Sequence, residues 1–342
     1  MIQWISQIKC NFAVSFAVSF AVLSLLGCGG ATSPTSVPPS WTKSKVLATN
    51  EDHPSKILVD DAFVYYVTGG TVASQQEGTN NIKRIALKNG EVSVLVKGGE
   101  QIPDTVLALD EQFVYWSNGS DILRVPKMGG PSEVIVAGAP MPAEMLVDDD
   151  NIYWLIWGGE NAPPQPVMFA PKQGGKAKPL TAPESAPNGL SLDSKAVYWM
   201  ASTGIRTVAK SGGEATSVYA NPTPKQVMSG LIQDTENFYF AQMTAQGSIA
   251  LMRLAKNTKT LTQLAPSINW TFDFVADDAY VYYFTEDKGG GSFGPIILQK
   301  VAKQGGEPIT LDKGSAGWVK YVAFDQAQLY FTDIAQVYAL HK

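Results

Sequence analysis

The stretch Leu192-Asp193-Ser194-Lys195-Ala196-Val197-Tyr198-Trp199 decides the fold of this chain, because the same phrase occurs seven times. An apolar strand ends at an Asp, a short polar turn follows, and a second apolar strand carries a Tyr followed by another aromatic residue. The repeated Asp residues are Asp60, Asp110, Asp148, Asp193, Asp234, Asp277 and Asp325. The aromatic pairs, each beginning five residues after its Asp, are Tyr65-Tyr66, Tyr115-Trp116, Tyr153-Trp154, Tyr198-Trp199, Tyr239-Phe240, Tyr282-Tyr283 and Tyr330-Phe331. The chain is therefore built from internal repeats.

Each repeat predicts four antiparallel strands. After the aromatic strand comes a third apolar strand that ends in a basic residue, as in 122–127. A Gly-Gly turn such as Gly129-Gly130 follows, and this pair suits a tight hairpin because glycine accepts positive φ. A short fourth strand closes the unit. Repeats 38 to 50 residues apart, with four strands each and no helical pattern, predict an all-β propeller.

The two ends of the repeat region predict how the ring closes. The seventh repeat stops at its third strand, in residues 337–342, and lacks a fourth. Residues 45–49 form a short apolar strand before the first repeat, with no blade of their own. We predict that this strand completes blade seven. The expected domain is a seven-bladed β-propeller of four-stranded blades over residues 42–342, because the even spacing disfavours an eighth, degenerate blade.

Residues 1–27 have the character of a secretory signal. Lys9 is their only charge, and the apolar run 12–26 is shorter than the roughly 20 residues that a membrane-spanning helix needs. Leu25-Leu26-Gly27-Cys28 resembles the bacterial lipobox, although Leu26 departs from the small residue usual there. We expect lipid attachment at Cys28, followed by a flexible Ser/Pro/Thr/Gly tether over residues 28–41. A plain signal peptide or a retained anchor helix is the alternative.

The aromatic repeats resemble those of a known group of propellers. Tyr330-Phe331-Thr332-Asp333 is similar to the Tyr-Trp-Thr-Asp repeat of the low-density-lipoprotein-receptor-type propellers, and Tyr115-Trp116-Ser117-Asn118 is a looser copy. Over residues 45–342 the chain also resembles bacterial domains of unknown function described as receptor-protein-1-like propellers, which include many secreted lipoproteins. The resemblance implies the fold and no particular activity. The receptor modules have six blades, whereas this chain has seven repeats.

The constant residues of the repeat are interpreted as scaffold. Each Asp is expected to accept hydrogen bonds from backbone N–H groups of its own turn. A metal site at 148–151 is disfavoured, since the same Asp occurs in all seven turns and the neighbours supply no ligand loop. The two aromatic residues of each pair point to opposite faces of a strand, so we expect them to pack between neighbouring blades.

The variable residues of the repeat are the candidate binding site. In this topology the loops between strands two and three, and the links from strand four to the next strand one, share one face. The residue four before each repeat Asp begins the innermost strand, and so should surround the mouth of the central channel. Long loops on the same face add aromatic and basic residues. The candidate rim consists of Lys56, Glu144, Trp157, Trp270, Asp273, Phe293, Trp318, Lys320 and Tyr321. For any single one, a solvated loop that tolerates insertion is the alternative.

Catalysis has little support in the sequence. The two His residues, His53 and His341, have no partner at useful spacing, and nothing indicates a cofactor or a metal. The net charge of −5 argues against nucleic-acid binding. We therefore predict a non-enzymatic lipoprotein of the cell envelope that is anchored through Cys28 and binds a protein partner through its loops. Gly29, in place of Asp, favours the outer membrane.

Two alternatives remain open at this stage. A small-ligand or carbohydrate binder would use Trp157, Trp270, Trp318 or Phe293 as stacking platforms. A propeller glycosidase or lyase would use Glu144 and Asp273 as acid and base across the channel, as paired carboxylates do in glycosidases.

Overall fold

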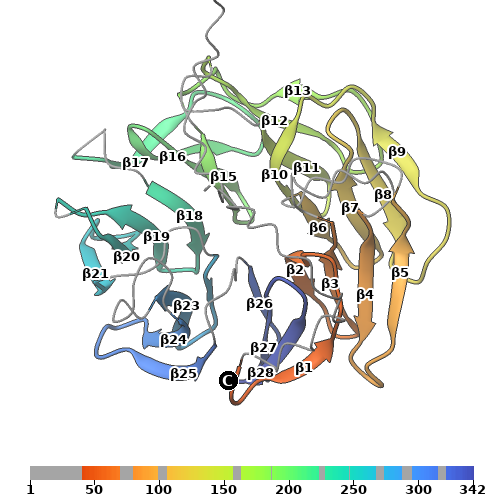
Figure 1. Ribbon diagram of the computed structural model, residues 1–342. Coiled ribbons are helices and arrows are strands. Elements are labelled where there is room, and N and C mark those ends of the chain that lie inside the picture. Colours follow the sequence, from red (N-terminus) through yellow and green to blue (C-terminus); the bar gives the residue numbers. More distant parts are fainter. Residues whose placement is uncertain are drawn as a thin grey trace, which may run out of the picture.

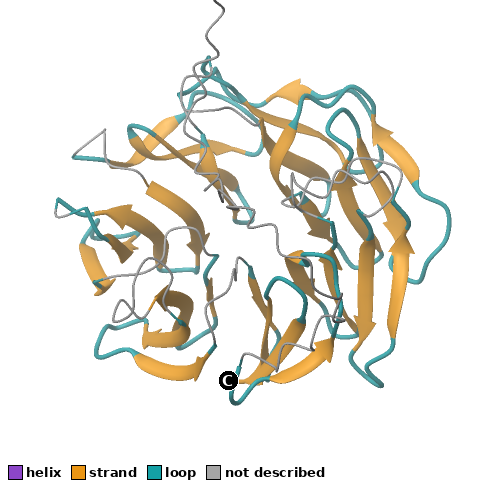
Figure 2. Ribbon diagram, in the orientation of Figure 1, coloured by secondary structure: helices purple, strands orange, loops and turns teal. Residues whose placement is uncertain are grey.

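The computed structural model describes residues 41–69, 80–98, 106–156, 163–185, 187–222, 228–245, 247–266, 273–286, 295–314 and 321–342. Within these ranges the chain consists of strands joined by turns and loops, with no helix (Figure 2). Nothing in the described part is therefore a helix long and apolar enough to cross a membrane. The strands form seven sheets arranged around a central axis (Figure 1). The predicted all-β, seven-bladed propeller is confirmed.

Each blade is an antiparallel sheet of four strands, and the innermost strands of neighbouring blades contact one another around the axis. Blades one and two contain β2 (Ser55–Val59), β3 (Phe63–Val67), β4 (Ile82–Ala86) and β5 (Val92–Val96), then β6 (Leu107–Leu109), β7 (Phe113–Ser117), β8 (Ile122–Pro126) and β9 (Glu133–Val136). Blades three and four contain β10 (Pro142–Val147), β11 (Asn151–Ile156), β12 (Val167–Pro171) and β13 (Lys178–Pro179), then β14 (Asn188–Leu192), β15 (Ala196–Ala201), β16 (Gly204–Ala209) and β17 (Thr216–Ala220). Blades five and six contain β18 (Met228–Gln233), β19 (Asn237–Met243), β20 (Ile249–Ala255) and β21 (Leu261–Ala265), then β22 (Val275–Ala276), β23 (Tyr280–Glu286), β24 (Ile296–Ala302) and β25 (Ile309–Lys313).

The seventh blade closes the ring as predicted. It contains β26 (Val322–Phe324), β27 (Gln328–Thr332) and β28 (Val337–His341), and its fourth strand is β1 (Lys45–Ala48). The register pairs Lys45 with Ala339 and Val46 with Tyr338 in antiparallel fashion. In Figure 1 this pairing brings the red start of the described chain beside its blue end. The first and last blades are therefore joined by backbone hydrogen bonds.

A second fastening, which the sequence did not reveal, lies just before β1. Trp41, the last residue of the expected tether, is buried and packs edge-on against Phe331 of blade seven with ring centroids 4.7 Å apart. The carboxylate of Asp312, on β25 of blade six, accepts hydrogen bonds from the backbone amides of residues 42–44 and from two of their hydroxyls. The entering segment therefore ties blade six to blade seven.

The hydrophobic core consists of seven clusters, one in each interface between blades. Tyr65 packs with Trp116 of the second blade, whereas its neighbour Tyr66 packs with Tyr330 of the seventh. Both residues of the pair are fully buried. The prediction that each aromatic pair packs between blades, with one side chain on each face of its own blade, is confirmed.

Candidate functional site

The propeller has two different faces. The turns between strands one and two, and between strands three and four, are short and lie on one side of the ring, which we call the clamp face. The connections between strands two and three, and the links from each blade to the next, lie on the other side, which we call the loop face. The clamp face shows what the constant residues of the repeat do, and the loop face shows what the variable ones can do.

On the clamp face, each repeat Asp organises its own turn. In blade five, one oxygen of Asp234 accepts hydrogen bonds from the backbone N–H groups of Glu236 and Asn237, at 2.9 and 2.7 Å. The equivalent pair of bonds occurs at all seven repeat Asp residues. The predicted role of Asp in these turns is confirmed.

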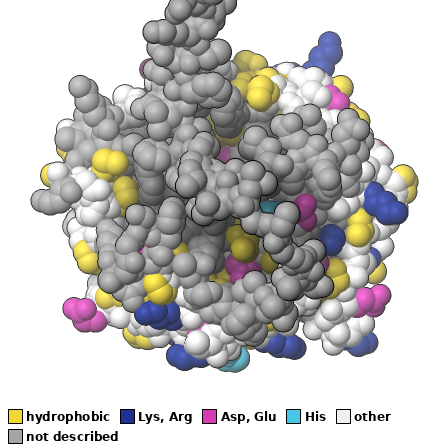
Figure 3. Space-filling view, in the orientation of Figure 1, with side chains coloured by type: hydrophobic (Ala, Val, Ile, Leu, Met, Phe, Trp, Pro, Cys, Tyr) yellow, Lys and Arg dark blue, Asp and Glu magenta, His cyan; other side chains and the backbone are white. Residues whose placement is uncertain are grey.

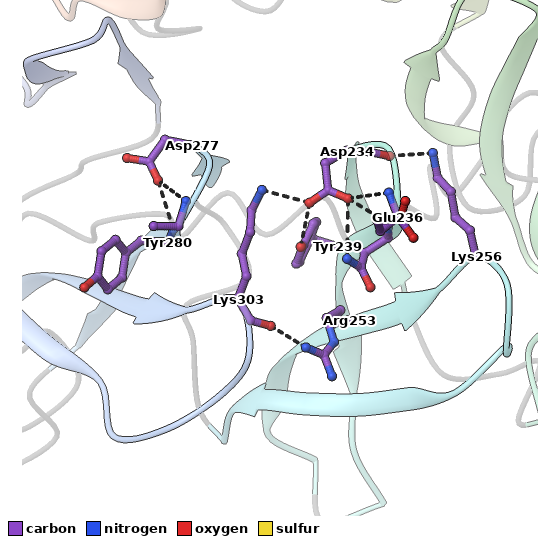
Figure 4. Close-up of polar contacts among 10 residues, drawn as sticks. Asp234, Glu236, Tyr239, Arg253, Lys256, Asp277, Tyr280 and Lys303 are labelled. Carbon is purple, nitrogen blue, oxygen red and sulfur yellow. Dashed lines mark hydrogen bonds and ion pairs between the residues drawn. The ribbon is translucent and has the colours of Figure 1, made fainter.

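The second oxygen of each Asp has a role that the sequence analysis missed. Asp234 accepts a hydrogen bond from the hydroxyl of Tyr239 at 2.8 Å and from the ammonium of Lys303 at 2.8 Å (Figure 4). Lys303 belongs to the next blade, and its backbone carbonyl accepts a hydrogen bond from Arg253. The ion pair therefore joins neighbouring blades. The same Lys–Asp bridge occurs at Lys127–Asp60, Lys172–Asp110, Lys210–Asp148 and Lys342–Asp277.

These bridges hold the carboxylates ionised. Burial opposes ionisation of Asp277, but hydrogen bonds from the Tyr282 hydroxyl, from two backbone amides and from Lys342 outweigh it and lower its pKa to about 2. Each bridging Lys comes from the basic residue near the end of the third strand. That recurring basic residue was the sequence signal that could have predicted the bridge.

The clamp face also carries a groove of about 560 Å³ between blades two and three. Its lining includes Asp110, Lys172 and Tyr115, which form one of the bridges just described. The groove therefore belongs to the structural ring of ion pairs.

On the loop face, four of the predicted rim residues come together at the mouth of the channel. Lys56 is the second residue of β2, Glu144 lies on β10, and Asp273 and Tyr321 lie just before β22 and β26. The ammonium of Lys56 is 4.0 Å from the Asp273 carboxylate and 5.6 Å from the centre of the Tyr321 ring. Glu144 interacts electrostatically with both Lys56 and Asp273. Blades one, three, six and seven thus contribute to one cluster, which we call the mouth cluster.

β-bulges in the innermost strands shape this region. The pairing of β2 with β3 shifts around Lys56, and that of β14 with β15 shifts around residues 189–190. The backbone amides of Gly189 and Leu190 lie close enough to the Glu144 carboxylate to lower its pKa. Gly189 has φ of 62°, and a Cβ there would lie 2.4 Å from the terminal methyl of Met200. The positive φ favours glycine at this position, where blade four approaches Glu144.

The channel walls raise the pKa of both acids. Burial raises the pKa of Glu144 to about 7, because the favourable effects of Lys56 and of two backbone amides do not offset desolvation, and the charge of Asp273 adds to the rise. Burial likewise raises the pKa of Asp273, against the effect of Lys56. About a third of the Asp273 side chain still faces the channel space, with an exposed fraction of 32%. Figure 3 shows acidic and hydrophobic side chains beside the hollow at the centre of the ring.

Not every residue at the repeat position of Lys56 and Glu144 belongs to the mouth cluster. Val106 occupies the equivalent position in blade two, but it is fully buried in the interface with blade three and does not line the channel. Trp157, Trp270, Phe293, Trp318 and Lys320 lie outside the described residues, as does Cys28. Within the described ranges, no group of three or more His, Cys, Asp or Glu side chains could hold a metal ion.

Comparisons with known proteins show the fold. No protein-family profile matches the sequence, and no curated protein is similar to it. Among solved structures, an oligogalacturonate lyase in complex with manganese is 10% identical over 89% of this chain and 96% of its own, with a TM-score of 0.62. A puromycin-hydrolyzing peptidase from Mycobacterium tuberculosis is 12% identical over 89% of this chain, with a TM-score of 0.63, and this chain covers 55% of it. BamB from Moraxella catarrhalis is 9% identical over 88% of this chain and 100% of its own, with a TM-score of 0.54.

Identities this low establish a shared β-propeller and nothing about activity. Two of these three proteins are named as enzymes, so the fold alone does not decide between catalysis and binding. The side chains at the channel mouth must carry the functional argument.

Proposed function

We propose that this chain is a non-enzymatic lipoprotein of the cell envelope whose loop face binds a protein partner. One observation carries the proposal. The constant positions of the repeat are used in the Asp–Tyr–Lys bridges and the aromatic interfaces, whereas the variable positions bring Lys56, Glu144, Asp273 and Tyr321 together at the channel mouth. The blades do not need charge at these positions, because Val106, Gly189 and Gly230 occupy them elsewhere. A charged cluster that the scaffold does not need is what a binding surface requires.

Exposed apolar side chains on the same face support the proposal. Met141, in the link that leads into β10, is 54% exposed, and Ile334, between β27 and β28, is 50% exposed. Protein interfaces combine an apolar buried core with a polar rim, and exposed apolar side chains on the loop face could contribute to such a core. The fold of this chain is also similar to the solved structures of TolB from Acinetobacter baumannii and of BamB, with TM-scores of 0.51 and 0.54.

The anchoring part of the proposal rests on the sequence. Residues 1–27 would direct export, and Cys28 would carry the lipid. Residues 28–41 would hold the propeller away from the membrane. We propose that this membrane is the outer membrane. In a Cys28→Ala variant we expect the protein to leave the membrane fraction, or its uncleaved precursor to accumulate. Unchanged processing and membrane association would contradict the lipid anchor.

A pair of exposed methionines on opposite faces provides the test of partner binding. A photo-crosslinking amino acid is placed at Met141, on the loop face, or at Met128, in the β8–β9 turn of the clamp face, where the side chain is 75% exposed. After irradiation of intact cells, we expect a specific protein adduct from position 141 and none from position 128. The absence of any adduct from position 141, or the same adduct from both positions, would argue against a partner on the loop face.

One observation favours an enzyme as the second candidate. A carboxyl group with pKa of about 7 next to a second carboxyl is suited to general acid–base catalysis, and Glu144 and Asp273 form such a pair. A glycosidase or lyase would then cleave a polysaccharide at the channel mouth. Release of new chain ends from envelope or plant polysaccharides by the wild type, and its loss in Glu144→Gln, would support this candidate over a binding protein.

A further inference from the structure

The charges of the mouth cluster do not balance. Among the residues that the structure describes, Lys56 is the cation that acts on both Glu144 and Asp273. Two carboxyl groups therefore share one ammonium group, and when both acids are ionised the described residues supply one positive charge for two negative charges. The clamp face differs in this respect, because five repeat Asp residues there have a Lys nitrogen within 3.2 Å.

The contacts of Lys56 show how the single ammonium is shared. Lys56 lies 4.0 Å from Asp273, at the long limit of an ion pair, and its ammonium also approaches the ring of Tyr321. The backbone amides of Gly189 and Leu190 lower the pKa of Glu144 but bring no charge to its carboxylate. A positively charged group that reached this cluster would therefore meet two carboxyl groups that interact with each other, and the ring of Tyr321 beside Lys56.

We propose that the mouth cluster binds a positively charged group of the protein partner, the ammonium of a Lys or the guanidinium of an Arg, between Glu144 and Asp273. This inference rests on the proposed function, because it names the chemistry by which the partner is recognised. A Lys or Arg that is desolvated in a concave site opposite carboxylates is a common energetic centre of protein interfaces.

The site should respond to pH in a defined direction. The groups that face Glu144 are Lys56 from β2, Asp273 before β22, and the amides of residues 189–190 from β14. Because burial raises the pKa of Glu144 to about 7, the carboxyl loses its proton, and so attracts a cation, only as pH rises through that value. Cation binding should therefore be stronger above pH 7 than below it. Protons and the cation compete for the same carboxylates.

Three probes of similar length and different charge test whether the mouth cluster binds a cation, an anion or a neutral group. Butylammonium, butyrate and 1-butanol are titrated into the purified full-length protein, and binding is measured by NMR at about pH 8.5 and about pH 5.5, on either side of the Glu144 titration. We expect butylammonium to bind at the higher pH and to bind at least about tenfold more weakly at the lower pH, as loss of one charge partner implies. Butyrate and butanol should not compete with it. Preferential binding of butyrate, or no binding of butylammonium at the higher pH, would overturn the inference.

Two kinds of variant assign the binding to these residues. Glu144→Gln and Asp273→Asn preserve shape and remove one negative charge each, so each should weaken butylammonium binding about tenfold or more. Lys56→Met removes the resident cation and should strengthen it. If the site instead binds anions, Lys56→Met abolishes binding of butyrate, which would contradict the inference. Circular dichroism and the unfolding temperature show that each variant is folded.

The crosslink from Met141 separates this inference from the proposed function. If the partner is captured by the wild type but much less by Asp273→Asn, both stand. If Asp273→Asn and Glu144→Gln capture the partner as well as the wild type does, a loop-face partner exists but the cationic contact is wrong. If butylammonium binds while no partner is captured, the mouth cluster takes the cationic group of a small amine, and the proposed protein partner is wrong.

Discussion

Replacing Glu144 by Gln should stabilise the protein, although the residue is part of the candidate site. Burial in the channel mouth raises the pKa of Glu144 from its ordinary value of 4.5 to about 7. The folded protein therefore binds the Glu144 proton more tightly than the unfolded chain does. The contribution of Glu144 to stability is greatest below pH 4.5, falls as pH rises, and is fully lost above pH 7. Gln is neutral at every pH and preserves the size and shape of the side chain.

The magnitude follows from the pKa. Each pKa unit corresponds to about 1.4 kcal/mol, so a rise from 4.5 to about 7 means that folding disfavours the ionised form of Glu144, relative to the protonated form, by roughly 3 kcal/mol. Water in the channel reduces this value, so we expect Glu144→Gln to raise the free energy of unfolding by about 1–3 kcal/mol near pH 8.5. For a protein of this size the unfolding temperature should rise by roughly 2–8 °C. Near pH 4 the two proteins should unfold at nearly the same temperature.

Thermal unfolding of both proteins at the two pH values provides the assay. The matched control is Glu214→Gln, which makes the same substitution at an exposed position in the turn between β16 and β17 and should change little at either pH. A Glu144→Gln variant that is less stable than the wild type near pH 8.5, or equally stabilised at both pH values, would refute the conclusion that burial raises the pKa of Glu144.

Three further substitutions test the scaffold. Asp277→Asn removes the charge that bridges to Lys342, and it should lower the free energy of unfolding by about 2 kcal/mol at neutral pH. Because the folded pKa of Asp277 is lowered to about 2, this difference should shrink as pH falls below about 4; a constant difference would contradict the bridge. Asp312→Ala leaves the amides of residues 42–44 without their acceptor, so hydrogen exchange of the β1 amides should accelerate at least tenfold while that of β11 is unchanged. Trp41→Ala removes a buried ring from the same segment and should lower the free energy of unfolding, measured with a chemical denaturant, by about 3–5 kcal/mol. Deletion of residues 45–48 should destabilise the protein more and give the largest fall in unfolding temperature.

Local features of the repeat were predictable from the sequence because they act within a few residues. An Asp that ends a strand bonds to amides two and three residues later, as Asp234 shows. The hydrogen bond from the Tyr five residues later to the second oxygen of the same Asp was not predicted, although it is equally local. The incomplete seventh repeat and the unassigned strand at 45–49 were enough to predict the closure of the ring. Trp41 was missed because one apolar residue after a Ser- and Pro-rich segment has no periodicity to indicate burial.

Contacts between repeats were harder to predict, because their partners are set by the geometry of the ring. Lys303 and Asp234 are 69 residues apart, and no spacing rule within one repeat pairs them. Counting back from each repeat Asp did place Lys56, Glu144 and Asp273 at the channel mouth. The same rule failed at Val106, because an apolar side chain at that position turns into the blade interface. The effect of the blade-four amides on Glu144 could not be predicted, because the pairing of β14 with β15 shifts between Asn188 and Ser191 and the sequence does not indicate that shift.

Carboxyl footprinting tests most directly whether a partner covers the channel mouth. Intact envelopes and the purified protein are treated with a carbodiimide and an amine, and labelling of each Asp and Glu is measured by mass spectrometry, with exposed Glu214 as the reference. We predict that Glu144 and Asp273 are labelled in the purified protein and protected in the envelope, while Glu214 is labelled equally in both. Equal labelling of Glu144 and Asp273 in the two preparations would contradict a partner bound at the loop face.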